Sequence, residues 1–178
     1  VSTVKKYKHQ WILIDAVDLL REEGIPIELH LVGGGDSQAL SWVRKAIQKK
    51  DPEREFIFVH GSLSYEETLE WYNKVDMFVF PSTCETFGIS LLEAMTAGLP
   101  IASSSRGPMP EVLKDAGLYF NPESVSSIKN CLRYMIDDRD LRQRFGIKAK
   151  QYSQTYSWKK CADETFGFLS SVSEKNTT

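Results

Sequence analysis

Short apolar runs alternate with amphipathic segments along the chain. The apolar runs predict β-strands, and the segments between them carry apolar residues near a 3.6-residue spacing, which predicts helices. Predicted strands cover 1–4, 26–33, 55–61, 76–80, 100–104 and 117–120, and predicted helices cover 9–24, 36–50, 64–75, 89–97 and 107–117. From Glu123 the pattern is helical, in two or three pieces that end near Val172, and we expect the polar tail 173–178 to be frayed.

Near-continuous apolar strands, each followed by a helix, are typical of a parallel sheet with both faces covered. We therefore predict an α/β fold in which residues 1–172 form one domain around a doubly wound, Rossmann-like parallel sheet. Asp36 or Ser37, and later Ser64, stand where predicted helices begin and are suitable caps. The four tryptophans fall on apolar helix faces, which predicts core positions for Trp11, Trp42, Trp71 and Trp158.

Composition excludes several classes of protein. The 178 residues carry 22 basic and 24 acidic side chains, a formal net charge of −2, so nothing indicates a nucleic-acid partner. No segment approaches the roughly 20 apolar residues of a membrane span. Three widely spaced cysteines fit neither a disulfide framework nor a CxxC metal site, which favours a reducing, cytoplasmic location. The chain opens on a strand-like stretch without a methionine, so we expect a fragment of a longer protein.

Candidate chemistry gathers in the loops that follow the predicted strands. These loops contain KKYKHQ, GGGD, HGSL, PSTCETFGI and SSSRGPMP. In open α/β sheets, ligands bind at the carboxyl ends of the strands. Ordinary turn chemistry explains each loop taken alone, but the convergence of all five on one edge of the sheet predicts a ligand site there. His30, inside a predicted strand, is better explained as a structural histidine with satisfied ring nitrogens.

The stretch CETFGISLLEAM, residues 84–95, joins the fourth loop to a helix. If Gly88 stands at the helix entry, the N–H groups of Gly88, Ile89 and Ser90 point toward a ligand. The aligned peptide dipoles add a partial positive charge at this end, which favours a phosphate group. Glycine would also let an anion approach the backbone closely.

Two glutamates, eight positions apart, lie on either side of this helix entry. Glu93 falls in or near the first turn, where a carboxylate complements the helix dipole. Glu85 lies before the helix and cannot serve that purpose. A carboxylate beside a phosphate site is unfavourable unless it has another role, such as accepting hydrogen bonds from sugar hydroxyls. A nucleotide sugar has hydroxyls on both sides of its pyrophosphate, so one glutamate would hold the ribose and the other the transferred sugar.

The stretch ETFGISLLEAMTAGLPI resembles the E-x7-E signature of the group 1 glycosyltransferases (family 4), which are retaining enzymes with two Rossmann-like domains. Nearly the whole chain shares the resemblance in the right order, through KHQWILIDAV, IELHLVGGG, FVHGSLSYEETLEWYNKVDMFVFPS, RGPMPEVLKDAGLYFNPES and YSWKKCADETFGFL. It implies one half of a two-domain B-type glycosyltransferase, namely the C-terminal domain that binds the nucleotide-diphosphate sugar. The acceptor site would belong to an N-terminal domain that is missing here.

The resemblance also implies roles for individual residues. Glu93 would bind the ribose hydroxyls, Glu85 the donor sugar, and Lys8 would neutralise the pyrophosphate as the bond breaks. The amides of the helix entry at Gly88 and its two successors would bind the same pyrophosphate. Other residues implied to bind the donor lie in the neighbouring loops: Gly61, Ser62 and Leu63 after His60 at the nucleobase, Gly33 and Gly34 nearby, and Arg106 and Gly107 on the sugar side.

One departure from the family pattern concerns the leaving group. Family members usually carry an arginine a few residues before the lysine, where this chain has Ser2 and Thr3. Either Lys5 or Lys6 takes its place, or Lys8 and the helix terminus act alone to stabilise the developing charge. No DxD-like metal motif accompanies the site, so we expect no metal ion and no required cofactor. Retention by a front-face displacement is what the family would imply.

Other classes of function compete with this hypothesis. A non-catalytic nucleotide-binding or interaction module on the same fold is the main alternative, because fold does not fix function. The combination of Lys8 with both glutamates favours the enzyme. An NAD-dependent dehydrogenase is poorly supported, since GGGDSQA follows the second strand and does not give G-x-G-x-x-G. We expect the isolated fragment to bind nucleotide sugars without efficient transfer. The sequence does not determine the base or the sugar of the donor, the acceptor, or whether the enzyme attaches peripherally to the inner membrane face.

Overall fold

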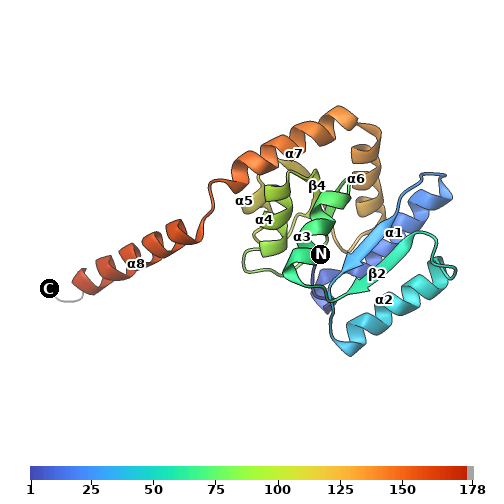
Figure 1. Cartoon of the computed structure of the whole chain (residues 1–178), viewed down its shortest axis with the longest axis horizontal. Helices are drawn as coiled ribbons and strands as arrows, with labels where there is room; N and C mark the ends of the chain where they lie inside the picture. Colours follow the sequence, from blue (N-terminus) through green and yellow to red (C-terminus); the bar gives the residue numbers. More distant parts are fainter. Residues whose placement is uncertain (176–178) are drawn as a thin grey trace.

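The structure is a computed structural model that describes residues 1–175 (Figure 1). Five short strands occur in the described part: β1 Leu29–Val32, β2 Ile57–Gly61, β3 Phe78–Phe80, β4 Ile101–Ser104 and β5 Gly117–Phe120. The helices are α1 Gln10–Glu22, α2 Ser37–Lys50, α3 Tyr65–Lys74, α4 Ile89–Ala97, α5 Met109–Leu113, α6 Val125–Asp137, α7 Arg139–Ser153 and α8 Trp158–Lys175, with a 3-10 turn, η1, at Lys6–Lys8. Each predicted helix is confirmed, within a few residues at its ends.

All pairings between the described strands are parallel, but the strands form two groups. In one group β1 pairs with β2, and in the other β4 lies between β3 and β5. The predicted strand at 1–4 contributes only an isolated parallel bridge between Val4 and Gly35. The predicted parallel α/β, Rossmann-like fold is therefore confirmed, whereas the expected continuous sheet is interrupted between β1 and β3.

Helices cover both faces of the strands, as a doubly wound fold requires. On one face α1 packs against α2 and α6; on the other, α4 packs against α3, α5 and α7. Each face has its own apolar cluster, one around Ile14, Leu20 and Leu132 and the other around Phe80, Leu91 and Met95. Strand β4 is buried along its whole length and contributes to both clusters, which explains its unbroken apolar and small-residue sequence.

Local sequence signals set the helix boundaries near the site. Of the two cap candidates for α2, Asp36 is the N-cap, and its carboxylate accepts a hydrogen bond from the Ala39 N–H at 2.8 Å. Ser64 and Glu67 form a capping box at the start of α3, in which each side chain bonds to the other residue's N–H. These caps place the loops after β1 and β2 at fixed points on the same edge.

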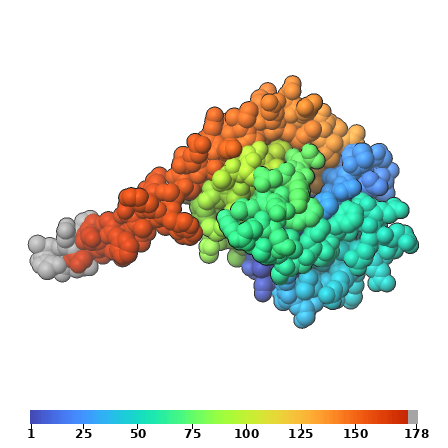
Figure 2. Space-filling model, viewed as in Figure 1, coloured from blue at the N-terminus to red at the C-terminus, as the bar shows by residue number. Residues whose placement is uncertain are grey.

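Helix α8 projects away from the rest of the molecule (Figures 1 and 2). Every residue from 157 to 173 is exposed, and Trp158 is 81% exposed, so the predicted core position of Trp158 is wrong. Amphipathic spacing shows that a helix has an apolar face but not what covers it. The helix extends to Lys175, into the tail predicted to be frayed at 173–178, and 176–178 lie outside the described residues. None of the described helices is long and apolar enough to cross a membrane.

Candidate functional site

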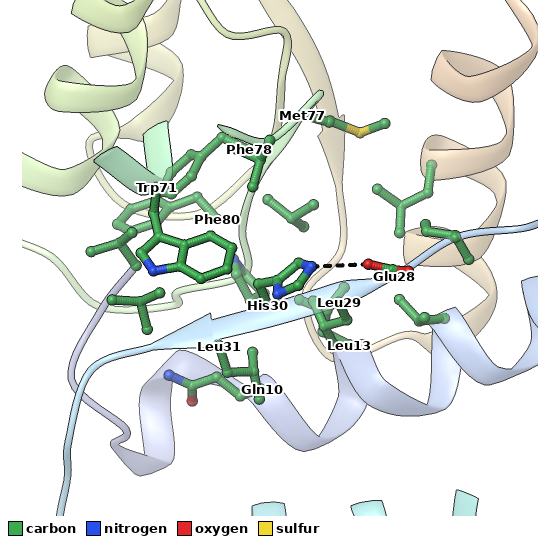
Figure 3. A pocket seen from close by; sticks show the side chains of 18 of the residues that line it. Gln10, Leu13, Glu28, Leu29, His30, Leu31, Trp71, Met77, Phe78 and Phe80 are labelled. Atoms are coloured by element: carbon green, nitrogen blue, oxygen red, sulfur yellow. Dashed lines mark hydrogen bonds and ion pairs between the residues drawn. The ribbon is translucent and has the colours of Figure 1, made fainter. Parts of the chain in front are cut away.

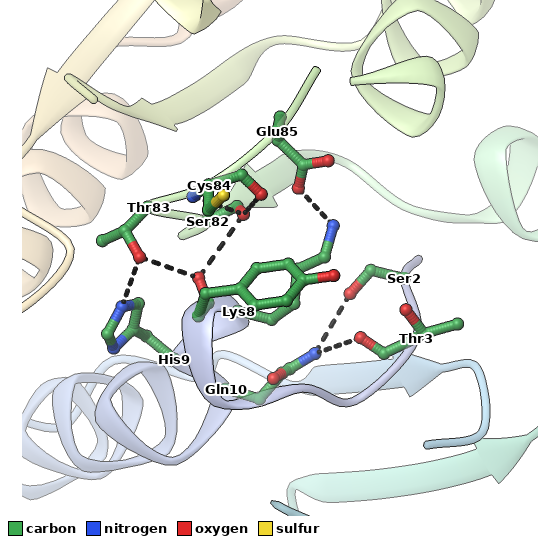
Figure 4. Close-up of polar contacts among 10 residues, drawn as sticks. Ser2, Thr3, Lys8, His9, Gln10, Ser82, Thr83, Cys84 and Glu85 are labelled. Carbon is green, nitrogen blue, oxygen red and sulfur yellow. Dashed lines mark hydrogen bonds and ion pairs between the residues drawn. The ribbon is translucent and has the colours of Figure 1, made fainter. Parts of the chain in front are cut away.

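Lys8 and Glu85 form the charged centre of the predicted site. The Lys8 Nζ donates a hydrogen bond to the Glu85 Oε1, as Figure 4 shows. Both side chains are largely buried, with 9% of Lys8 and 14% of Glu85 exposed. The ammonium also lies 5.2 Å from the centre of the Phe80 ring, within the range of a cation–π contact. The structure therefore brings the two residues predicted to be catalytic into direct contact.

Polar side chains join the loop that carries Lys8 to the loop that carries Glu85. The sequence pattern did not predict their roles. The Thr83 N–H donates to the Tyr7 carbonyl at 2.8 Å, and the Thr83 hydroxyl lies 3.1 Å from the Nε2 of His9 (Figure 4). The hydroxyl of buried Ser82 donates to the same Tyr7 carbonyl. Lys8 stands between Tyr7 and His9, so these bonds fix its position beside Glu85. In the sequence, the run of polar residues after β3 was the one indication of these hydrogen bonds.

His9 joins the 3-10 turn to α1 in an unusual conformation. Its φ of 49° lies in the left-handed region, which is uncommon for a residue other than glycine. Burial lowers the pKa of the His9 imidazole, although the charge of Glu123 opposes this change. A neutral ring can therefore act at neutral pH as hydrogen-bond partner of Thr83.

The entry of α4 has the predicted geometry. Gly88 is the N-cap residue and adopts φ 91°, a left-handed conformation that glycine adopts without steric cost. The N–H groups of Ile89 and Ser90 have no acceptor within the helix, because no earlier turn precedes them. Gly88 is buried and Ile89 is 48% exposed, so this end of the helix opens toward solvent. Such an end is suited to an anion.

Glu93 lies just beyond the first turn of α4 and points toward α3. No acidic residue occupies the first turn itself, so dipole complementation explains Glu93 less well than expected. Its carboxylate accepts a hydrogen bond from the Tyr72 hydroxyl at 3.0 Å. Burial and the neighbouring charge of Glu93 hold the pKa of Tyr72 well above its ordinary value, so this hydroxyl stays protonated.

The two glycine-containing loops lie against each other. The Gly33 N–H donates to the Gly61 carbonyl at 2.7 Å. A Cβ on Gly34 would come within 2.5 Å of the Ser62 hydroxyl, so a side chain there would require the Ser62 side chain to move. The structure thus joins the loops after β1 and β2, as predicted, while Leu63 is half-buried beside them. Their contact with a nucleobase stays a prediction.

Arg106 and Gly107 form the exposed loop after β4. The Arg106 N–H donates to the Ser104 hydroxyl at 3.1 Å, and Gly107 adopts φ 58°. Among the described residues the Arg106 guanidinium makes no ion pair, so the structure does not bring it into contact with Lys8 or Glu85. Its predicted place on the sugar side stays a prediction.

The two other lysines of the first loop do not join the pair. Lys5 lies 3.8 Å from the Asp36 carboxylate, and Lys6 is exposed. Lys8 is the buried lysine within the described part of the chain. Of these three lysines, Lys8 is the one that contacts the loop before α4, through Glu85. Which cation acts on the leaving group stays a prediction.

Comparison with known proteins identifies the family of this chain. The family model described as "Glycosyl transferases group 1" matches residues 1–152. Sulfoquinovosyl transferase SQD2 of Arabidopsis thaliana is 34% identical over 104 residues, which cover 56% of this chain and 20% of the relative. The chain spans less than half the length of the curated relatives it matches.

Two solved structures share the fold. Anabaena Alr3699/HepE in complex with UDP has a TM-score of 0.82 at 22% identity, covering 96% of this chain and 47% of that one. The C-terminal domain of a glycosyl transferase group 1 family protein, LpcC from Francisella tularensis, has a TM-score of 0.76 at 22% identity, covering 86% and 81%. The family match extends over most of the chain and includes each of the predicted site loops. The chain belongs to the group 1 family of glycosyl transferases.

Proposed function

We propose that this chain is the donor-binding half of a retaining glycosyltransferase that uses a nucleotide-diphosphate sugar. The observation that carries the proposal is the buried Lys8–Glu85 pair next to the open N-terminal end of α4. A cation and free N–H groups on one side suit a diphosphate, and a carboxylate on the other suits sugar hydroxyls. A module that only binds a partner protein does not need this combination.

Lys8 and the α4 entry would hold the diphosphate. Among the described residues, Glu85 is the anion that Lys8 contacts. A bound diphosphate would add a second anion, and Lys8 would then lie between the leaving group and the carboxylate. As the glycosidic bond breaks, negative charge grows on the diphosphate, where a preorganised ammonium and the helix N–H groups lower its energy. No metal ion or cofactor is required in this proposal.

The two glutamates would have separate tasks. Glu93, fixed by the Tyr72 hydroxyl, would accept hydrogen bonds from the ribose hydroxyls. Glu85, held close to Lys8, would accept them from the transferred sugar. The Gly33-Gly34 and Gly61-to-Leu63 loops would border the base. Transfer with retention, through a front-face displacement, is the part of the proposal that rests on the family resemblance alone.

An N-terminal domain of the same longer chain would supply the acceptor site. Two features support this: the chain spans less than half of its curated relatives, and α8 presents exposed apolar side chains such as Phe166 and Leu169. The isolated fragment would then bind donor without efficient transfer. We propose a cytoplasmic location for the whole enzyme, with any contact with the inner membrane face made by the other domain.

Calorimetric titration with UDP, GDP and ADP, and then with their sugar conjugates, tests this proposal. UDP is the first probe because the Anabaena neighbour was crystallised with it. We expect saturable binding of one diphosphate that Glu93→Ala weakens and Glu70→Ala leaves unchanged, since Glu70 is exposed and pairs only with Lys74. If no diphosphate binds, or if both variants lose affinity equally, the proposed donor site is wrong.

A further inference from the structure

Phe87 is an apolar residue in the otherwise polar loop that carries Glu85. It directly precedes Gly88, the N-cap residue of α4. Its side chain is half-buried and packs against the apolar cluster around Met95. A residue at this position commonly packs against the fourth residue of the helix, here Leu92, which borders the same cluster. Phe87 therefore helps to set the angle at which the loop enters α4.

The Phe87 ring also contacts Tyr156, a residue that is distant in the sequence. Tyr156 lies in the linker 154–157 between α7 and α8. The two ring centroids are 5.3 Å apart and the ring planes are inclined by 70°. Aromatic pairs favour this edge-to-face arrangement, because the positive edge of one ring meets the negative face of the other. The Tyr156 hydroxyl makes no hydrogen bond within residues 1–175, so the contact depends on the ring.

Other contacts hold the two ends of the loop. At the first end, the Glu85 carboxylate accepts a hydrogen bond from Lys8. At the second end, a Cβ on Gly88 would lie 3.4 Å from the Phe80 ring, so this ring forms a wall beside the helix entry. Phe80 is itself stacked on Phe78, with ring centroids 5.9 Å apart (Figure 3). Both ends of the loop therefore rest on groups that the body of the protein holds in place.

The middle of the loop has no such support from hydrogen bonds. Within residues 1–175, neither Thr86 nor Phe87 forms a hydrogen bond with another residue. Thr86 is exposed, so it is the side chain of Phe87 that joins this segment to the body. That side chain packs against the apolar cluster and against the Tyr156 ring. Loss of the Tyr156 ring would leave one side of Phe87 uncovered.

Hydrogen bonds on both sides of Tyr156 hold its own backbone. The Tyr156 N–H donates to the Ser153 carbonyl at 3.1 Å, at the end of α7. The Lys160 N–H donates to the Ser157 hydroxyl at 3.1 Å, so α8 is capped by the residue next to Tyr156. The ring is therefore presented to Phe87 from a short linker whose two ends are fixed, at the point where α8 leaves the body (Figure 1).

We propose that Tyr156 is a positioning residue for Glu85. Through the Phe87 ring it holds the loop between Glu85 and Gly88, and with it the carboxylate that would accept hydrogen bonds from the transferred sugar. The consequence for the sugar rests on the function proposed for Glu85. A purely structural Tyr156 would instead stabilise the fold and affect every ligand of the site alike.

The first test requires no ligand. Backbone order parameters from nuclear magnetic resonance are compared between this chain, Tyr156→Ala, Tyr156→Phe and the control Trp158→Ala, which removes a ring that is 81% exposed. We expect the order parameters between Glu85 and Gly88 to fall from about 0.85, typical of a rigid backbone, to below about 0.6 in Tyr156→Ala. Tyr156→Phe keeps the ring and should keep the parent values, as should Trp158→Ala. If Tyr156→Ala does not fold, Tyr156→Leu takes its place. Unchanged values in the ring-removing variant would overturn the proposal.

The second test compares UDP with UDP-glucose by calorimetry, because the Anabaena neighbour was also crystallised with UDP and glucose. We expect Tyr156→Ala to weaken UDP-glucose by about tenfold and UDP by less than about twofold, since the contact of Glu85 with the sugar is the one disturbed. In a chain that already carries Glu85→Ala, Tyr156→Ala should then cause no further loss. Trp158→Ala should leave both affinities unchanged.

Two results would overturn the positioning role: an equal loss for UDP and UDP-glucose, or a further loss in the Glu85→Ala chain. If the parent chain binds neither ligand, the proposed function fails for this donor. The order parameters then decide separately whether Tyr156 holds the loop.

Discussion

The ammonium of Lys8 and the carboxylate of Glu85 are hydrogen-bonded although 77 positions separate them in the sequence. The pair joins the loop before α1 to the loop after β3, on the two sides of the interrupted sheet. Both groups are nearly buried, so neither is fully solvated. The cation of the site is therefore held in position by the protein's own carboxylate.

Replacement of Lys8 should affect the diphosphate specifically. We expect Lys8→Met to weaken UDP binding by roughly 1.5–3 kcal/mol, the scale of a hydrogen bond to a charged group, and to change uridine binding little. Lys6→Met, on an exposed neighbour, is the control and should leave both affinities unchanged. An equal loss for UDP and uridine would show that Lys8 acts on the fold of the loop and not on phosphate. Calorimetry measures both ligands.

Replacement of Glu85 and of Glu93 by alanine should affect different parts of the donor. Glu93→Ala should weaken the free nucleotide by about 1.5–3 kcal/mol, because a charge-assisted hydrogen bond to ribose is lost. Glu85→Ala should spare the free nucleotide and weaken the nucleotide sugar. Tyr72→Phe keeps the Glu93 carboxylate but removes the hydroxyl that positions it, so it should weaken the free nucleotide less than Glu93→Ala does. Equal loss of free nucleotide affinity in both glutamate variants contradicts this division.

Gly33 should tolerate a side chain far less well than Gly24, although both have positive φ. A Cβ on Gly33 would lie 2.0 Å from the Ser2 carbonyl oxygen, whereas a Cβ on Gly24 meets nothing within 4 Å. We expect Gly24→Ala to cost about 1–2 kcal/mol through its backbone conformation alone. Gly33→Ala should cost at least about 2 kcal/mol more, because the backbone must move. Urea unfolding measures both, and similar losses would mean that Ser2 and Thr3 do not pack against Gly33.

The stability of this chain should fall as the pH is lowered through about 6.5. Burial lowers the pKa of the His9 and His60 imidazoles below the ordinary 6.5, so in this range the unfolded chain binds protons that the folded chain does not. Stability is then fully present above this range and decreases as the pH falls. Urea unfolding at several pH values measures the change. An identical pH profile for His60→Gln would contradict the contribution of His60.

Removal of α8 should leave the body of the protein folded. Because residues 157–173 are exposed throughout, a chain ending at Ser157 loses little packing. We expect the melting temperature to change by less than about 3 °C, which corresponds to roughly 1 kcal/mol for a domain of this size. A larger fall in calorimetric scans would show that α8 packs against the body in solution.

The sequence predicted the parts of this structure that depend on local signals. Helix caps at Asp36 and Ser64 and the glycine at the α4 entry could be recognised because each acts within a few residues. The interruption of the sheet could not be recognised, because it depends on which strands pair with each other across long stretches of sequence. The roles of Thr83 and Tyr72 also escaped prediction, because their partners Tyr7 and Glu93 are distant in the chain.

Trp158 stands at the start of α8, in water on every side that the structure describes. The other tryptophans, Trp11, Trp42 and Trp71, are half-buried in the body. An indole that leaves water for an apolar surface changes its fluorescence emission, while half-buried indoles far from the contact change little. The projecting helix thus carries its own optical reporter. Assembly of this chain with any covering partner should be visible as a blue shift of Trp158, without a label.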